Sequence, residues 1–420
     1  MKKTARFWKA LALGGTLILT ACNGGGPSGT QVQVQLVNGL DEPINATAAA
    51  YRVGNGPFQP LNPSGLGTYT FTVPAGQDRY TVVFRCPSFG TLSAAVNAQS
   101  YELTLQEATT FKARCFGAYA GPEANLNQSD DNTSSQNFSG GSATVHSATV
   151  ITVLSDEGSN GIVNDIDNAF RVPVGPNREV AIFGSVGGTY YFGRDFFSIS
   201  PTTTTLPSPI TVNPVSASFA TSNPAQANLL GKEVNISLGS GTSFPQPSTD
   251  PDDLYQVLTF SGTSATLKRI PASSLPSTVN ISAPSLAFSP TVPTPGAGNL
   301  PTFQGLSASG FSGGISLRGY LLVLNWPMGS AWQHFVSQGA LGGSTSYSLP
   351  DPTAVAGLTA LKPTSGDTVS WQAAALGTNK PLSDLLAARP IPQGIGFDLL
   401  DRRLALELEA EGAGGSYTQP

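Results

Sequence analysis

QVQVQLVNG, residues 31–39, alternates polar and apolar residues and ends in a turn signal. Val32, Val34 and Leu36 alternate with glutamines, so apolar side chains would line one face of a strand and amides the other. Asn38-Gly39 follows as a turn signal. The pattern predicts a half-buried β-strand at the start of a β-rich body.

Similar short runs of β-branched and aromatic residues continue up to about residue 118, with Gly, Pro and Asn turns between them. We expect strands at 47–53, 69–73, 80–86, 101–105 and 110–116. So many short strands within roughly 90 residues are typical of a compact β-sandwich.

Two segments in this region resemble a known module: NGLDEPINATAAAY (residues 38–51) and TYTFTVPAGQDRYTVVF (residues 68–84). They are similar to the prealbumin-like β-sandwiches of carboxypeptidase regulatory domains and bacterial surface proteins. The resemblance covers residues 31–118 and implies a β-sandwich there. Gln77-Asp78-Arg79 departs from the family pattern by lengthening the usual tight hairpin.

The hairpin sequence recurs further along the chain. FTVPAGQDRYTVVF from Phe71 and FRVPVGPNREVAIF from Phe170 coincide at six positions without a gap, and weaker echoes begin at Lys268 and Tyr347. The spacing of the copies is close to one β-sandwich per repeat. The sequence therefore predicts an all-β protein of tandem Ig-like or prealbumin-like β-sandwich modules, each with such a hairpin.

Composition shifts divide the chain into units. A short helix is expected within 380–390, and the alternation in RLALELEAEG (403–412) predicts a half-buried terminal strand. The expected units are a lipoprotein signal peptide (1–21), a lipidated cysteine with flexible tether (22–30), β-sandwich domain 1 (31–118), a polar linker (119–144), β-rich domain 2 (145–215), β-rich module 3 (216–300), a C-terminal β-rich domain (301–411) and a disordered tail (412–420).

The N-terminus has the features of an export signal, with four basic residues before an apolar run at 11–19. This run is shorter than the ~20 residues that a membrane-spanning helix needs. Leu19-Thr20-Ala21-Cys22 resembles the bacterial lipobox, which implies that Cys22 becomes the lipid-modified N-terminus and anchors the chain in a membrane. The alternative is an ordinary secretory signal that leaves Cys22 as a free thiol.

The tether that follows, residues 23–30, is rich in glycine and would span about 15–17 Å as a random coil. Asn23 stands where some lipoproteins retained in the inner membrane carry Asp. The resemblance therefore favours an extracytoplasmic address at the outer membrane or cell surface.

Assigning Cys22 to lipid leaves Cys86 and Cys115 as an even pair of cysteines. Each shares the apolar face of its expected strand, so we expect a buried disulfide that closes a loop of about 29 residues. Two buried free thiols are the alternative. No histidine lies near either cysteine, so a metal site there is not expected.

Charged residues make up 11% of the chain, against about 25% in typical domains, and the formal net charge is −5. No basic patch is visible, which disfavours nucleic-acid binding.

GFSGG around Ser312 matches a hydrolase elbow, but a strand-like segment follows it where the elbow requires a helix. With only His146 and His334 as histidines, we expect no catalytic residues.

Two groups of residues are candidates for binding. Trp326 and Trp332 could stack on sugar rings, with burial in a sandwich core as the alternative. Asp156, Asp165 and Asp167 could gather around calcium, with solvated turn acids as the alternative, and no other cofactor is expected.

These observations predict a lipid-anchored envelope protein with a non-enzymatic, structural or adhesive role. Its expected partners are the membrane, reached through Cys22, and an envelope protein or glycan. A carbohydrate- or ligand-binding surface lipoprotein is the alternative, and a secreted hydrolase is a more distant one.

Overall fold

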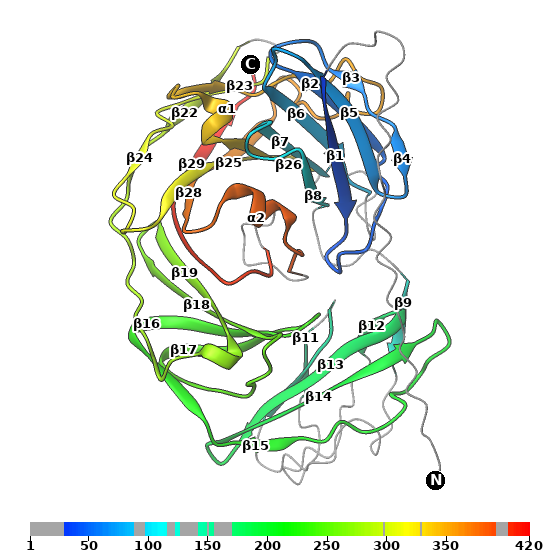
Figure 1. Ribbon diagram of the computed structural model, residues 1–420, viewed down its shortest axis with the longest axis vertical. Helices are drawn as coiled ribbons and strands as arrows, with labels where there is room; N and C mark the ends of the chain where they lie inside the picture. The colour runs from blue at the N-terminus through cyan, green and yellow to red at the C-terminus, as the bar shows by residue number, and fades with distance from the viewer. Residues whose placement is uncertain are drawn as a thin grey trace, which may run out of the picture.

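The structure is a computed structural model that describes residues 29–87, 97–115, 122–126, 142–148, 151–154, 170–296, 299–327, 330–391 and 402–420. Its elements are strands with two short α-helices and one 3-10 turn, so the all-β prediction is confirmed. The strands form sheets that pack face to face in sandwich-like layers (Figure 1). No helix in these ranges is long and apolar enough to cross a membrane.

The N-terminal sandwich has a four-stranded sheet as one of its layers. Val32, Val34 and Leu36 of β1 point into the core while the intervening glutamines do not, as the alternation predicted. β1 pairs antiparallel with β5 and parallel with β8. In sheet order the strands are β4 (Pro63–Gly65), β5 (Thr68–Pro74), β1 (Gly29–Val37) and β8 (Thr110–Arg114).

The opposite layer belongs to one thirteen-stranded sheet that continues through most of the molecule. In Figure 1 it runs from the blue strands at the top, down the left side, to the green strands below. Its strands in order are β17 (Asn235–Pro245), β16 (Ser218–Leu230), β18 (Leu254–Ser261), β19 (Ser264–Pro271), β29 (Leu406–Thr418), β28 (Thr368–Thr378), β25 (Ser316–Trp326), β26 (Ser330–Ser337), β7 (Asn97–Thr104), β6 (Arg79–Arg85), β2 (Ala48–Val53) and β3 (Gln59–Pro60), with β20 (Thr278–Val279) beside β16.

This sheet joins strands from three of the units expected in sequence, 31–118, 216–300 and 301–411. The first junction is the parallel pairing of β7 with β26, and the second is the antiparallel pairing of β19 with β29. Each junction covers a strand edge that a separate module would expose. Strands of the three units are therefore hydrogen-bonded into one sheet.

The recurring segment that begins at Phe71 and at Phe170 forms a corner between two sheets and not a hairpin. β5 and β6 flank the first copy, but β5 lies in the four-stranded sheet and β6 in the thirteen-stranded one. Phe71 and Tyr80 face each other edge-on across the sandwich, with ring centroids 5.5 Å apart. In the second copy, β12 (Phe170–Pro173) pairs with β9 (Glu123–Leu126) and β13 (Gly175–Val186) pairs elsewhere. The predicted hairpins were wrong, because alternation shows which face is buried and not which strand is the partner.

The remaining layers pack on both sides of the long sheet. One face carries the core of the N-terminal sandwich, which extends over β19 and β29 to helix α2 (Leu382–Ala387), within the predicted helical segment. Small sheets cover part of the opposite face. They are β21 (Ala287–Phe288) with β24 (Ala308–Ser309), and β22 (Thr291–Pro295), β23 (Pro301–Gln304) and β27 (Ser346–Ser348), near helix α1 (Gln338–Leu341).

A five-stranded sheet forms the lower part of the molecule in Figure 1. Ala181 and Phe183 on one face pack against the β16–β18 end of the long sheet, while Val180 and Ile182 pack on the other side with β9 and β12. Its strands are β11 (Ile151–Leu154), β10 (Ser142–His146), β13, β14 (Thr189–Ile199) and β15 (Asn213–Val215).

The chain ends in a strand. β29 runs from Leu406 to Thr418 and pairs with β28 from Leu408 to Thr418. The expected terminal strand is confirmed, and the disordered tail expected at 412–420 is corrected. Its glycines and Ser416 look like a loop, but their backbone groups complete the β28 ladder, which composition alone does not reveal.

Candidate functional site

The predicted disulfide is present. Cys86 follows β6 and Cys115 follows β8, and their Cα atoms lie 5.4 Å apart. β6 and β8 belong to opposite layers of the N-terminal sandwich. Both cysteines are 2% exposed. The bond therefore ties the two layers together from inside the core.

Several predicted sites lie outside the described residues. These are Cys22 with residues 23–28 of its tether, and the candidate calcium ligands Asp156, Asp165 and Asp167. Gly29 and Thr30, the last two residues of the expected tether, belong to β1 instead. Within the ranges that the structure does describe, no group of three or more His, Cys, Asp or Glu side chains could hold a metal ion.

Trp332 cannot act as a surface platform for sugars. Its ring is 1% exposed and packs in the core of β25, β26 and β28. The indole N–H donates a hydrogen bond of 2.7 Å to Ser100 Oγ, so even its polar edge is used inside the protein. The stacking role predicted for Trp332 was wrong. Trp326 is half-buried against the same core, and its role stays a prediction.

Trp332 begins a buried chain of hydrogen bonds that crosses β26, β7 and β27. Ser100 Oγ lies 2.6 Å from His334 Nδ1, and His334 Nε2 lies 2.7 Å from Tyr347 Oη. Tyr347 donates in turn to Glu102 Oε2 at 2.7 Å. If His334 is neutral and carries its proton on Nε2, each group in the chain donates to the next: Trp332 to Ser100, Ser100 to His334, His334 to Tyr347 and Tyr347 to Glu102. Arg52 then pairs with Glu102 at 2.8 Å.

The pKa values agree with this assignment. Burial lowers the pKa of His334 to about 4, which keeps the ring neutral. Burial alone would raise the pKa of Glu102, but the Arg52 guanidinium and the hydrogen bonds from Tyr347 and Thr81 lower it overall. Ser100, Glu102 and His334 are each at most 1% exposed. Despite its resemblance to a catalytic relay, this network is closed to a substrate and fixes the packing of three strands.

An accessible polar site lies instead where β19 meets β29. Ala265 and Leu267 of β19 enter the core together with Leu406, Leu408 and Ala410 of β29. Because side chains alternate along a strand, the intervening residues face the other way. There Thr266 pairs directly with Glu409, and Lys268 with Glu407. A polar ladder thus runs along the face opposite the core.

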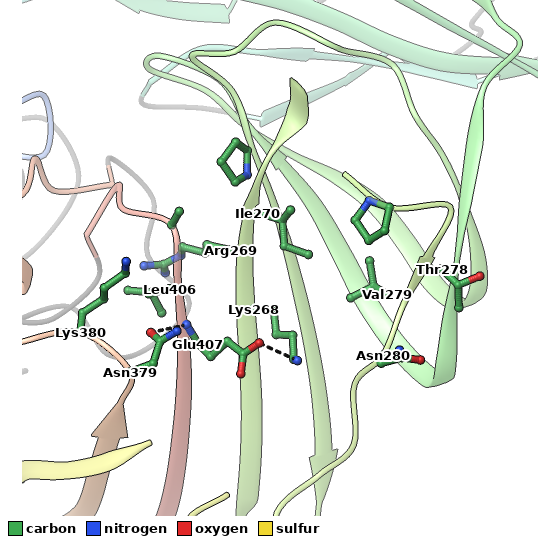
Figure 2. A pocket seen from close by; sticks show the side chains of 13 residues that line it. Lys268, Arg269, Ile270, Thr278, Val279, Asn280, Asn379, Lys380, Leu406 and Glu407 are labelled. Atoms are coloured by element: carbon green, nitrogen blue, oxygen red, sulfur yellow. Dashed lines mark hydrogen bonds and ion pairs between the residues drawn. The ribbon is translucent and has the colours of Figure 1, made fainter. Parts of the chain in front are cut away.

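Two connected hollows lie over this ladder. One of about 550 Å³ extends toward Pro271, Val279 and Lys380, and one of about 300 Å³ covers Thr266 and Glu409. Lys268, Asn280 and Glu407 line both. Figure 2 shows Lys268 and Glu407 on neighbouring strands, with Thr278, Val279 and Asn280 on the segment across from them. We call the combined space the β19–β29 groove.

The polar contacts in the groove are uneven. Lys268 Nζ pairs with Glu407 Oε1 at 2.7 Å, and the Glu407 backbone N–H donates to Asn379 Oδ1 at 3.0 Å. Glu409, in contrast, accepts one hydrogen bond from the Ser312 backbone N–H at 2.9 Å and forms no ion pair with any described residue. The Thr266 hydroxyl has no partner in the described part of the chain.

Ser312 thus serves as a backbone donor to Glu409. It lies in an exposed turn between Gly310 and Gly314, whose φ angles are 93° and 87°, and strand β25 follows. The strand-like segment expected after GFSGG is confirmed, so the motif is a glycine-rich turn that leads into a strand.

The groove could not be predicted from the sequence. The alternation of Leu406, Leu408 and Ala410 with glutamates correctly indicates a half-buried strand, but it does not show what covers the glutamate face. β20 and the turn at Ser312, which cover that face, come from distant segments. A ladder of glutamates opposite Ser, Thr and Lys becomes visible only once the β19–β29 pairing is known.

No protein-family model matches the sequence, and no curated protein matches it. Among solved structures, two crystal structures of the pilus adhesin SpaC from Lactobacillus rhamnosus GG match with 9% and 10% identity and TM-scores of 0.14 and 0.15. Both alignments cover 74% of this chain and 44% of the adhesin, so this chain spans less than half of the adhesin's length. TM-scores this low do not establish a shared fold.

Proposed function

We propose that this protein is held to the bacterial cell envelope by lipid on Cys22, and that its β-rich body works there by display and binding, without catalysing a reaction. The observation that carries the proposal is the pairing of Cys86 with Cys115. It accounts for two of the three cysteines of the chain and leaves the one that follows the lipobox-like Leu19-Thr20-Ala21.

The architecture supports a display role. Strand β1 begins at Gly29, only seven residues after Cys22, so the body would sit close to the lipid surface. One continuous sheet and a buried disulfide make this body resistant to local opening. A disulfide also fits an oxidising compartment outside the cytoplasm.

Substitution of the lipid-accepting cysteine tests the anchor. In a bacterial host that processes lipoproteins, the full chain should sediment with membranes, resist a high-salt wash and dissolve in detergent. Cys22→Ala should move it to the soluble fraction, because acyl chains contribute about 0.8 kcal/mol per buried CH₂.

The matched control is the double variant Cys86→Ala/Cys115→Ala, which removes the other two cysteines, keeps the lipid-accepting Cys22 and should stay with the membrane. Sedimentation of Cys22→Ala to the same extent as the unmodified chain would overturn the anchor.

A further inference from the structure

We propose that the β19–β29 groove binds a glycan, with the free hydroxyl groups of one sugar ring seated over Glu409 and Thr266. This deepens the binding role proposed above and rests on it, but it does not depend on the lipid anchor. Both side chains lie on the groove face of directly paired residues.

Glu409 is a buried carboxylate whose charge is poorly compensated. It is 2% exposed, and its hydrogen-bond partner among the described residues is one backbone N–H, on Oε2. A buried charge is costly unless it is paired or hydrogen-bonded. Its neighbours on β29 differ, since Glu407 pairs with Lys268, and Glu411 accepts from the Thr263 and Ser264 hydroxyls. Glu409 is thus the acid on this ladder that a donor group from outside would satisfy.

Thr266 provides an independent observation at the same place. It is 3% exposed, lines the smaller hollow and leaves its hydroxyl without a hydrogen-bond partner. An orphaned buried hydroxyl costs free energy in the empty state. Because Thr266 lies opposite Glu409, one hydroxyl group of a ligand could donate to the Glu409 carboxylate while a second one bonds the Thr266 hydroxyl.

The charge of the groove favours an uncharged ligand. Lys268 and Lys380 offset Glu407 and Glu409. There is no excess negative charge to attract a lysine side chain or a polyamine. A neutral ligand rich in hydroxyl groups can still donate charge-assisted hydrogen bonds to Glu409.

The groove walls offer both polar groups and apolar surface, which suit the hydroxyl groups and the C–H face of a sugar ring. Exposed Asn280 offers an amide that can both donate and accept, and Asn223, whose amide nitrogen donates to the Ile281 carbonyl at 2.7 Å, offers its amide oxygen. The larger hollow adds apolar surface from Pro271, Pro276 and Val279, against which the C–H face of a ring can pack. The volumes of about 550 Å³ and 300 Å³ are in the size range of ligand pockets.

The test uses the full chain in detergent and a printed array of bacterial and host oligosaccharides, followed by titration with the best-bound glycan. Thr266→Val is the key variant because it keeps the side-chain shape and deletes only the orphaned hydroxyl. We expect it to weaken glycan binding about tenfold, the equivalent of one hydrogen bond, and to raise the thermal midpoint of the unliganded chain. Glu409→Gln should weaken binding at least as much.

Thr259→Val is the matched control. Thr259 pairs with Thr266 across β18 and β19, but its hydroxyl donates to the Pro224 carbonyl at 2.9 Å. This variant should bind the glycan normally and have a lower thermal midpoint. The opposite signs of the two stability changes separate loss of a ligand contact from general damage to the sheet.

Three results would overturn the proposal. One is array binding no stronger than that of an unrelated lipoprotein, and another is unchanged glycan affinity in both Thr266→Val and Glu409→Gln. The third is groove-dependent binding of a lysine-rich peptide or spermidine in place of any glycan. If the Cys22 test succeeds and one of these results is obtained, the lipid anchor stands and the glycan proposal is rejected.

Discussion

At the scale of single residues, burial decides which polar groups hold the structure and which could meet a ligand. His334 and Tyr347 are enclosed, and each has partners on both sides. Glu409 and Thr266 are equally buried but incompletely bonded, and they border a cavity. The sequence alone does not distinguish the two bonded residues from the two incompletely bonded ones.

Acid should destabilise the protein through His334. Burial lowers its folded-state pKa to about 4, below the value of about 6.5 for an unfolded histidine. Its stabilising contribution is therefore complete above pH 6.5 and is lost as the pH falls toward 4. For this one group the full loss would be about 3 kcal/mol. The free energy of urea unfolding, measured between pH 7 and pH 4, checks this.

His334→Gln should have a flatter pH profile over that range, although it is less stable at pH 7. His146, whose pKa burial also lowers to about 4, would keep part of the slope. Parallel profiles for the variant and the unmodified chain would contradict the neutral, buried assignment of His334.

At the scale of elements, the strands were predictable and their partners were not. Residues that alternate, such as Val32, Val34 and Leu36, define a strand locally, because period-2 burial needs no knowledge of the rest of the chain. The pairing of β7 with β26 joins segments more than 200 residues apart, and nothing local encodes it. The Cys86–Cys115 bond could be predicted because these two cysteines remained once Cys22 was assigned to lipid. The β19–β29 groove could not, because it depends on a pairing between distant strands.

The disulfide should contribute strongly to the N-terminal sandwich. It closes a loop with a sequence separation of 29, for which the chain-entropy model gives about 3–4 kcal/mol. Cys86→Ala/Cys115→Ala should lower the free energy of unfolding by about this amount, as measured by urea titration without reductant. Dithiothreitol should then destabilise the unmodified chain and leave the double variant unchanged. Equal stability of the two proteins would contradict a formed, structural disulfide.

At the scale of the whole molecule, ion pairs link parts that the long sheet does not join directly. Arg178 of β13 pairs with Glu42, after β1, at 2.5 Å and with Glu233, between β16 and β17, at 3.2 Å. Arg194 of β14 pairs with Asp253, before β18, at 2.7 Å. These contacts tie the five-stranded sheet to the β16–β18 end of the long sheet and to the segment after β1 in the N-terminal sandwich, so the β-rich body should behave as one cooperative structure.

Removing the Arg178 guanidinium should weaken this coupling. Glu233, whose side chain is 5% exposed, would keep only Arg389 at 4.0 Å as an ion-pair partner among the described residues. Breaking a buried pair typically costs about 3–5 kcal/mol, because one charge stays behind unpaired. Arg178→Met should therefore lower the calorimetric unfolding temperature.

Adding Glu233→Gln to that variant should recover part of the loss, since the stranded charge is then removed. If the double variant unfolds at the same temperature as Arg178→Met, or if Arg178→Met unfolds at the same temperature as the unmodified chain, the pair does not couple the two sheets.

Mass spectrometry of the mature N-terminal peptide from purified membranes would show whether lipid tethers this body. The peptide should begin at Cys22 and carry the mass of a diacylglyceryl group, with or without a further acyl chain. A mature chain with an unmodified Cys22, or one that begins at another residue, would contradict the lipid tether.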